Sequence, residues 1–156
     1  MRIPSGFKRV ETGIAIGVLA VCAVIFLPRG ASASEQSRVR EAGDELRQMG
    51  ESFRQFRRNN GYYPPDTVVG KLPPEMRSRF REHNPFQGLT PIGGQYDYEH
   101  HADSDILCVC IVGSSIIEPP TLDDAMALDA YIDDGDLRTG NFRAVDGGFA
   151  YAFDRK

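Results

Sequence analysis

The pattern of hydrophobic positions divides the chain into an apolar N-terminal segment and a longer, mixed remainder. Residues 12–27 contain no charged side chain, whereas charged and apolar residues are interspersed through the rest of the sequence. As a helix this segment would span about 24 Å, against roughly 30 Å for the core of a bilayer. Arg2, Lys8 and Arg9 precede it, so the positive-inside rule predicts a cytoplasmic N-terminus and an extracytoplasmic location for residues 30–156.

Beyond the apolar segment, a second helical pattern extends from Glu35 to Asn60. Its apolar and small positions form one narrow stripe: Val39, Ala42, Leu46, Met49, Phe53 and Phe56. Spacings of three and four residues place these side chains on one helix face, and Asn59-Asn60-Gly61 supplies a stop signal. About three heptads without continuation favour packing on a sheet over a coiled coil. We expect residues 7–59 to form one long, interrupted helix.

The sequence after this helix predicts mainly strands. Gln95–Glu99 alternates tyrosines with polar residues, and Ile106–Val112 is a continuous β-branched run typical of a central strand. Asn141–Val145 and Phe149–Phe153 flank Asp146-Gly147-Gly148 and predict a last hairpin. The expected fold is α+β, in which the long helix packs on a small antiparallel sheet of about four strands.

Two shorter helices are expected as well. Pro73-Pro74-Glu75 begins a segment that reaches His83, and proline is tolerated in the first turn of a helix. Thr121-Leu122-Asp123-Asp124 is a capping signal for a helix that reaches Ile132. Between the first of these and the sheet, Asn84-Pro85-Phe86-Gln87-Gly88 predicts a loop.

Composition and charge exclude some classes of protein. The 156 residues fit one domain, and 41% hydrophobic residues are enough for a core, which excludes wholesale disorder. A net charge of -4 argues against nucleic acid as a partner. The charge is unevenly spread, with a balance of +4 over residues 36–81 and -12 over residues 82–154. We infer that complementary patches of this kind, including Arg54, Arg57 and Arg58, could guide contacts between copies.

The sequence contains few motifs that indicate catalysis or metal binding. The sequence has no P-loop, no G-x-S-x-G and no H-E-x-x-H motif, so nothing positive indicates an enzyme. His100-His101 with Asp103 and Asp105 lacks zinc-ligand spacing and indicates a solvated loop. Cys108 and Cys110 share one face of a predicted strand. We expect them to be small core side chains without a mutual disulfide.

The N-terminus carries the most specific motif. Gly6-Phe7-Lys8-Arg9-Val10-Glu11, followed by the apolar segment, resembles the leader junction of type IV pilins and type II secretion pseudopilins. The resemblance implies cleavage between Gly6 and Phe7 by a prepilin peptidase and methylation of the new Phe7 amine. It also implies that Glu11 directs assembly, because a buried carboxylate is tolerated when the ammonium group of an adjacent subunit neutralises it. Lys8 and Arg9 depart from the family pattern, which usually has uncharged residues after the cut.

Further matches extend the resemblance along the chain. Pro28 lies where many pilin helices carry a proline, and Asn60-Gly61-Tyr62-Tyr63-Pro64-Pro65 is similar to the turn that ends the long helix in many pseudopilins. The implied organisation is a leader peptide at 1–6, a transmembrane and polymerisation helix at 7–28, an amphipathic continuation at 29–60 and a globular head at 61–156.

The resemblance also implies a location and partners. The protein would be a single-pass protein of the cytoplasmic (inner) membrane with an extracytoplasmic C-terminal domain, and it would be extracted into a filament on assembly. Its partners would be other pilin or pseudopilin subunits, the prepilin peptidase, the inner-membrane assembly platform and the lipid bilayer. Such a protein is a structural subunit of a type IV pilus or of a type II secretion pseudopilus.

One acidic segment is a candidate metal site. Asp133, Asp134 and Asp136 stand on a glycine-containing turn with Asp129 nearby, and clustered carboxylates offer the oxygen ligands that calcium prefers. The resemblance adds that some pseudopilins brace a late loop with calcium. A purely structural Asp-Gly turn is favoured ahead of the calcium site. No other cofactor is expected.

Two other outcomes of N-terminal processing remain open. Ala31-Ser32-Ala33 is a small-residue site of the kind that signal peptidase cuts, and cleavage after Ala33 would release a secreted or periplasmic binding module. Alternatively, the chain keeps its first six residues and anchors a domain that does not polymerise. The mature protein would begin at Phe7 in a pilin, at Ser34 in a secreted module and at Met1 in an uncleaved anchor.

Overall fold

The computed structural model describes residues 32–100 and 106–155, and a compact unit begins at Ala33. The helices are α2 (Ala33–Asn60) and α3 (Leu122–Ile132), with 3-10 turns η1 (Pro74–Met76) and η2 (Pro85–Gln87). The strands are β1 (Gln95–Glu99), β2 (Ile106–Val112), β3 (Phe142–Val145) and β4 (Gly148–Arg155). The expected α+β class and four-stranded antiparallel sheet are confirmed.

The segments that carry the predicted processing and assembly signals lie outside the described residues. These are the leader, the apolar run and, with them, Gly6, Phe7, Glu11 and Pro28. In the part of the chain that is described, no helix is both long enough and apolar enough to cross a membrane.

The sheet has the order β1-β2-β4-β3, and every neighbouring pair is antiparallel. The apolar run Ile106–Val112 is therefore a central strand, as its composition predicts. In the last hairpin Val145 pairs with Gly148, so Asp146 and Gly147 form a two-residue turn. Gly147 has a φ of +80°, a backbone conformation that side chains disfavour.

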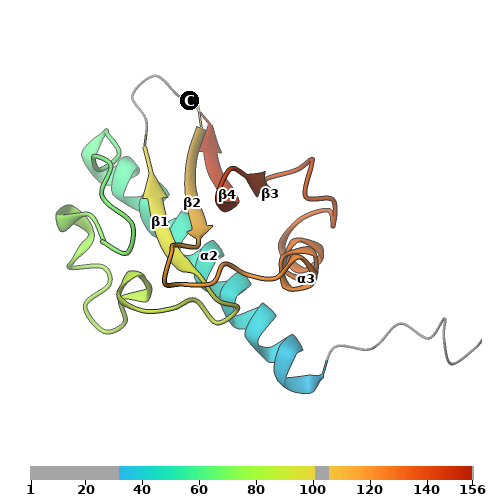
Figure 1. Cartoon of the computed structure of the whole chain (residues 1–156). Helices are drawn as coiled ribbons and strands as arrows, with labels where there is room; N and C mark the ends of the chain where they lie inside the picture. Colours follow the sequence, from blue (N-terminus) through green and yellow to red (C-terminus); the bar gives the residue numbers. More distant parts are fainter. Residues whose placement is uncertain (1–31, 101–105, 156) are drawn as a thin grey trace, which may run out of the picture. The chain divides into compact units, whose positions relative to one another are not determined.

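Helix α2 packs along one face of the sheet, where the main core lies (Figure 1). All six apolar stripe positions are buried: Val39, Ala42, Leu46, Met49, Phe53 and Phe56. They meet alternate residues of the strands, among them Tyr96, Tyr98, Val109 and Phe153. The amphipathic pattern is thus explained by a helix that is buried against a sheet on one side and charged on the other.

Two glycines on α2 allow other elements to approach closely. A Cβ atom at Gly43 would lie 2.6 Å from Tyr131 Cδ1 of α3, and one at Gly50 would lie 2.7 Å from the Cβ atom of Phe153 in β4. Both distances are shorter than carbon atoms tolerate without movement. The absence of a side chain at these two glycines therefore allows α3 and β4 to lie this close to α2.

Replacing Gly50 by alanine is expected to lower the free energy of unfolding, although alanine is the better helix former. The propensity gain is about 1 kcal/mol, whereas overpacking a tight contact costs about 1–3 kcal/mol. Urea unfolding of the detergent-solubilised full chain measures the net effect. Ser37→Ala is the matched control, because Ser37 is exposed on the same helix. A Gly50→Ala protein more stable than this control would contradict the packing argument.

The expected helix from Pro73 to His83 is not formed. Only η1 is helical, and turns follow it as far as residue 82. This segment places just two large apolar side chains, Met76 and Phe80, in the core. Short helices depend on tertiary burial for their stability, and one apolar pair does not supply enough of it. The predicted loop at 84–88 contains the 3-10 turn η2, which the Asn84 side chain caps.

Candidate functional site

The acidic segment folds as a turn between α3 and β3. Helix α3 begins as predicted, because the Thr121 side chain accepts a hydrogen bond from the Asp124 amide at 3.1 Å. The helix ends at Ile132, and Asp133 and Asp134 follow directly. Gly135 and Gly140 adopt φ values of +82° and +72°, so the turn depends on glycine at both positions.

Three of the four predicted carboxylates lie together. Oxygen atoms of Asp129, Asp133 and Asp134 all lie within 4.8 Å of one another. A calcium ion binds oxygen at about 2.3–2.6 Å, so two ligands of one ion lie at most about 5 Å apart. The geometry of these three oxygens fits that limit.

Asp136 does not belong to the cluster, contrary to the sequence prediction. Its carboxylate accepts hydrogen bonds from Arg138 Nε at 2.9 Å and Nη2 at 3.0 Å. This pairing lowers the pKa of Asp136. Spacing along the chain groups Asp136 with the other acids, but Arg138 binds the Asp136 carboxylate and takes the place of a cation there.

Asp133 and Asp134 also hold the turn together. Asp133 Oδ2 accepts hydrogen bonds from the backbone amides of Asn141 and Phe142, the latter at 2.9 Å. Asp134 accepts from the Asp136 amide at 2.9 Å and from the Thr139 hydroxyl at 2.8 Å. These contacts are those of a structural Asp-Gly turn, so Asp133 and Asp134 alone do not require a cation.

Asp129 is different, because its side chain is fully buried and neither carboxylate oxygen makes a hydrogen bond of standard geometry. Burial, followed by the charges of Asp134 and Asp133, raises the pKa of Asp129 to about 6, and the Gly135 amide opposes this rise only in part. An unsatisfied buried polar group costs about 1–3 kcal/mol. Asp129 is thus a buried acid beside two others, and a bound cation would compensate it.

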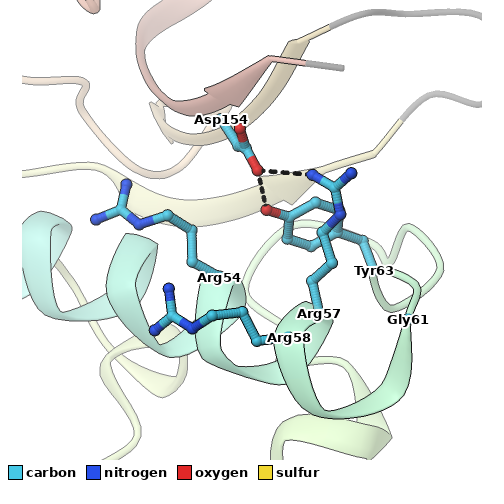
Figure 2. A pocket seen from close by; sticks show the side chains of 6 residues that line it. All are labelled: Arg54, Arg57, Arg58, Gly61, Tyr63 and Asp154. Carbon is cyan, nitrogen blue, oxygen red and sulfur yellow. Dashed lines mark hydrogen bonds and ion pairs between the residues drawn. The ribbon is translucent and has the colours of Figure 1, made fainter.

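A second cluster lies at the C-terminal end of α2, around a hollow of about 270 Å³ (Figure 2). Arg54, Arg57 and Arg58 line it together with Tyr63 and Asp154. The Asp154 carboxylate accepts hydrogen bonds from the Tyr63 hydroxyl and from Arg57 Nη1, the latter at 3.0 Å. Burial and the hydrogen bond to Asp154 raise the pKa of Tyr63 to about 12, so the phenol stays protonated at neutral pH.

A β-bulge places Asp154 in this cluster. Cys108 pairs with Ala152, whereas Leu107 pairs with Asp154, so Phe153 is an extra residue in β4. The extra residue turns Asp154 to the α2 side of the sheet, where alternation alone would have turned it away. Arg54 donates to the Phe153 carbonyl at 2.8 Å, and both Arg54 and Arg58 pair with Glu51. The pairs with Glu51 lie within α2, whereas the Arg54 hydrogen bond to Phe153 and the Arg57–Asp154 ion pair join the end of α2 to β4.

The face of the sheet opposite α2 carries an acid and thiol group that the sequence prediction did not identify. We call it the outer face, and its residues are Asp97, Glu99, Cys108, Cys110, Ala150 and Ala152. Asp97 pairs with Cys110, and Glu99 pairs with Cys108. The two cysteines are free thiols and lie apart from the main core on the α2 side. The expectation of a core side chain is confirmed for Cys110, which is buried, whereas Cys108 is half-buried.

Asp97 lies in an unfavourable environment for a charge. It is 5% exposed, and burial raises its pKa to about 7, with the Glu99 carboxylate as the next contribution. Between the thiols, a hydrogen bond lowers the pKa of Cys108 and raises that of Cys110, because the Cys110 thiol can donate to a Cys108 thiolate. Cross-strand register brings these groups together, which explains why a linear pattern did not reveal them.

No protein-family model matches the chain, and neither a curated protein nor a solved structure is significantly similar to it.

Proposed function

We propose that the protein is a pilin-like structural subunit, which is held in the cytoplasmic membrane by residues 7–28 and assembles into a type IV pilus or a type II secretion pseudopilus. The observation that carries the proposal is the order of segments along the chain. An uncharged apolar segment with one acid directly before it leads into an amphipathic helix, and that helix packs on an antiparallel sheet. The protein would act by polymerisation rather than by turnover of a substrate.

In this proposal Glu11 determines register in the filament. Glu11 lies one helical turn after Phe7, whose free amine would appear on cleavage after Gly6. Two such groups from adjacent subunits neutralise each other, whereas a single buried carboxylate in lipid is strongly unfavourable. Pro28 would loosen the helix where it leaves the bilayer, because proline removes a backbone donor.

The acidic cluster would stabilise the head by binding calcium. Asp129, Asp133 and Asp134 supply oxygen ligands, and among the described residues only the Gly135 amide partly compensates the buried Asp129 carboxylate. Because the cluster joins the end of α3 to the start of β3, a cation there would fix the connection between the helix and the edge strand.

A secreted or periplasmic binding module is the second candidate, and one observation favours it. The compact unit begins at Ala33, directly beside the predicted signal-peptidase site. Cleavage after Ala33 would leave almost all of α2 in the mature protein. In that case the acidic surface would contact a cation or a basic partner instead of a neighbouring subunit.

Mass spectrometry of the N-terminal peptide of the native protein tests both candidates. A methylated N-terminus at Phe7 is the expected result, whereas Ser34 would identify the secreted module. An N-terminus at Met1 would mean that the leader is retained and that the chain does not assemble as a processed pilin.

Replacing Glu11 by alanine is expected to prevent filament incorporation while the head stays folded. An unpaired buried charge costs about 3–5 kcal/mol, equivalent to more than a hundredfold in assembly. The fraction of chain in sheared filaments measures the effect. Glu75→Ala is the control, because Glu75 is exposed in the head. Equal incorporation of the two variants would exclude the proposed role of Glu11.

A further inference from the structure

We propose that the solvent side of α3 docks on the C-terminal end of α2 in a second copy of this chain, and that the contact repeats from head to head. The first surface, which we call the α3 face, consists of Leu122, Asp123, Met126, Ala127 and Ala130. The second surface, which we call the basic end, consists of Arg54, Arg57, Arg58 and Tyr62. The inference rests on the proposed function only for its setting, a row of copies joined through their N-terminal helices.

The α3 face is unusually apolar for a surface that meets solvent. Its five residues are the exposed positions of α3, and only Asp123 among them is charged. Leu122 is 63% exposed and Met126 is 48% exposed, and residues four apart on a helix are neighbours. The solvent side of a surface helix is normally polar, whereas a helix that is apolar on both sides is normally covered on both. The composition of α3 therefore indicates a partner on this face.

The charge around the α3 face limits what that partner is. Residues 118–136 contain seven acids and no lysine or arginine. Such a region repels an anionic membrane surface and attracts a basic one. The occupant should therefore combine positive charge with exposed apolar surface.

The basic end has the required charge. Arg54 and Arg58 pair with Glu51, and Arg57 pairs with Asp154, around the hollow of about 270 Å³ (Figure 2). Three guanidinium groups thus share two carboxylates, which leaves one positive charge in excess. The side chains of Arg57 and Arg58 are 46% and 55% exposed. A further carboxylate can therefore reach them from outside.

The basic end also has the required apolar surface. Tyr62 is 56% exposed and packs edge-on against Phe56, with ring centroids 5.6 Å apart. It lies in the chain between Gly61 and Tyr63, which both line the hollow. Methionine makes favourable contacts with aromatic rings. In the proposed contact, Met126 and Leu122 of one copy cover Tyr62 of the next, and Asp123 pairs with Arg58.

The two surfaces of one copy do not meet each other. Tyr131 fixes α3 to α2 through its hydroxyl, which donates to Asp44, and its carbonyl, which accepts from Arg47, both at 3.0 Å. Arg58 is eleven residues beyond Arg47, about 16 Å along the helix. Figure 1 shows α3 beside the N-terminal part of α2, away from its C-terminal end. A contact between two different surfaces is heterologous, so it can continue from copy to copy.

Photo-crosslinking of the detergent-solubilised full chain tests the contact. The photoreactive residue p-benzoylphenylalanine is incorporated in place of Met126, and the chain is irradiated at low salt. We expect a covalent dimer in which residue 126 of one copy is joined to the segment 54–63 of another. The yield should fall roughly fivefold to tenfold at high salt and in Arg58→Glu, because both remove the attraction between exposed charges.

A charge exchange separates this contact from a general loss of charge. The double variant Arg58→Glu/Asp123→Arg reverses both partners, so its yield should return close to that of the wild-type pair. Arg79→Glu is the matched control, because Arg79 is exposed outside both surfaces and the change in charge is the same. The photoreactive residue at Leu89, which is also exposed, should give no dimer through segment 54–63.

Three results would overturn the inference: no covalent dimer at low salt, a dimer joined at another segment, or no recovery in the double variant. The N-terminal peptide of the same preparation separates this inference from the proposed function. A methylated Phe7 without the cross-link would retain the pilin-like subunit and reject the contact. The cross-link in a chain that begins at Ser34 would retain the contact and reject the pilin-like subunit.

Discussion

Replacing Phe53 by alanine is expected to destabilise the head by about 3–5 kcal/mol, the usual range for a fully buried phenylalanine. Phe53 has no exposed surface and stacks on Tyr98, with ring centroids 4.2 Å apart, and on Phe153 at 5.5 Å. The substitution would therefore leave a cavity between α2, β1 and β4. Whole domains are stable by only about 5–15 kcal/mol, so the substitution would remove a large part of the stability of the head.

Chemical denaturation of the detergent-solubilised full chain, followed by near-ultraviolet circular dichroism of the tyrosines, measures this loss. Leu89→Ala is the control, because Leu89 is 65% exposed and exposed substitutions usually change stability by less than about 0.5 kcal/mol. Phe53→Leu should give an intermediate value. If Phe53→Ala and Leu89→Ala unfold at the same denaturant concentration, Phe53 does not anchor the helix to the sheet.

Calcium is expected to stabilise the wild-type protein and to have little effect on Asp129→Asn. A ligand present at about one hundred times its Kd adds about 2.7 kcal/mol to the stability of the folded state. The asparagine variant keeps the size of the side chain but removes the charge that the cation would neutralise. Thermal unfolding with calcium and with chelator measures the difference. Asp123→Asn is the matched control, since Asp123 is exposed on the same helix.

Without calcium, Asp129→Asn should be the more stable protein at neutral pH. The pKa of Asp129 is raised from 3.8 to about 6 in the folded state, so its ionisation opposes folding increasingly from about pH 4 and fully above about pH 6. This penalty is on the order of 1–3 kcal/mol, and it is relieved as the pH falls from about 7 toward 4. The advantage of the variant should shrink over that range. A calcium response equal in both proteins would contradict the proposed site.

The helical stripe on α2 was predictable, because a period of about 3.6 residues is a local property of the sequence. The capping signal at Thr121 and the turn at Gly147 are local for the same reason, and the structure has both. The expected helix at residues 73–83 failed because its stability would have had to come from tertiary burial. Sequence signals for a helix do not reveal how much apolar surface the segment buries in the folded protein.

The candidate sites likewise fall into one that spacing along the chain predicts and others that only the packed structure brings together. Grouping acids by spacing identified Asp129, Asp133 and Asp134, but it also included Asp136, whose carboxylate pairs with Arg138. No spacing rule could connect Asp97 with Cys110, or Tyr63 with Asp154, because these pairs depend on strand register and on the bulge at Phe153. A one-residue change of register would turn the strand residues of these pairs, Asp97, Cys110 and Asp154, to the other face.

The sequence by itself determined the apolar segment with Glu11 before it, the amphipathic helix and the strands. Each of these features depends only on the order and periodicity of residues that are neighbours in the chain. The tertiary structure alone decided how closely α3 and β4 approach Gly43 and Gly50. It also decided which acids are buried and which thiols face them. Those properties depend on residues far apart in the chain, whose proximity is fixed only when the sheet and helix pack.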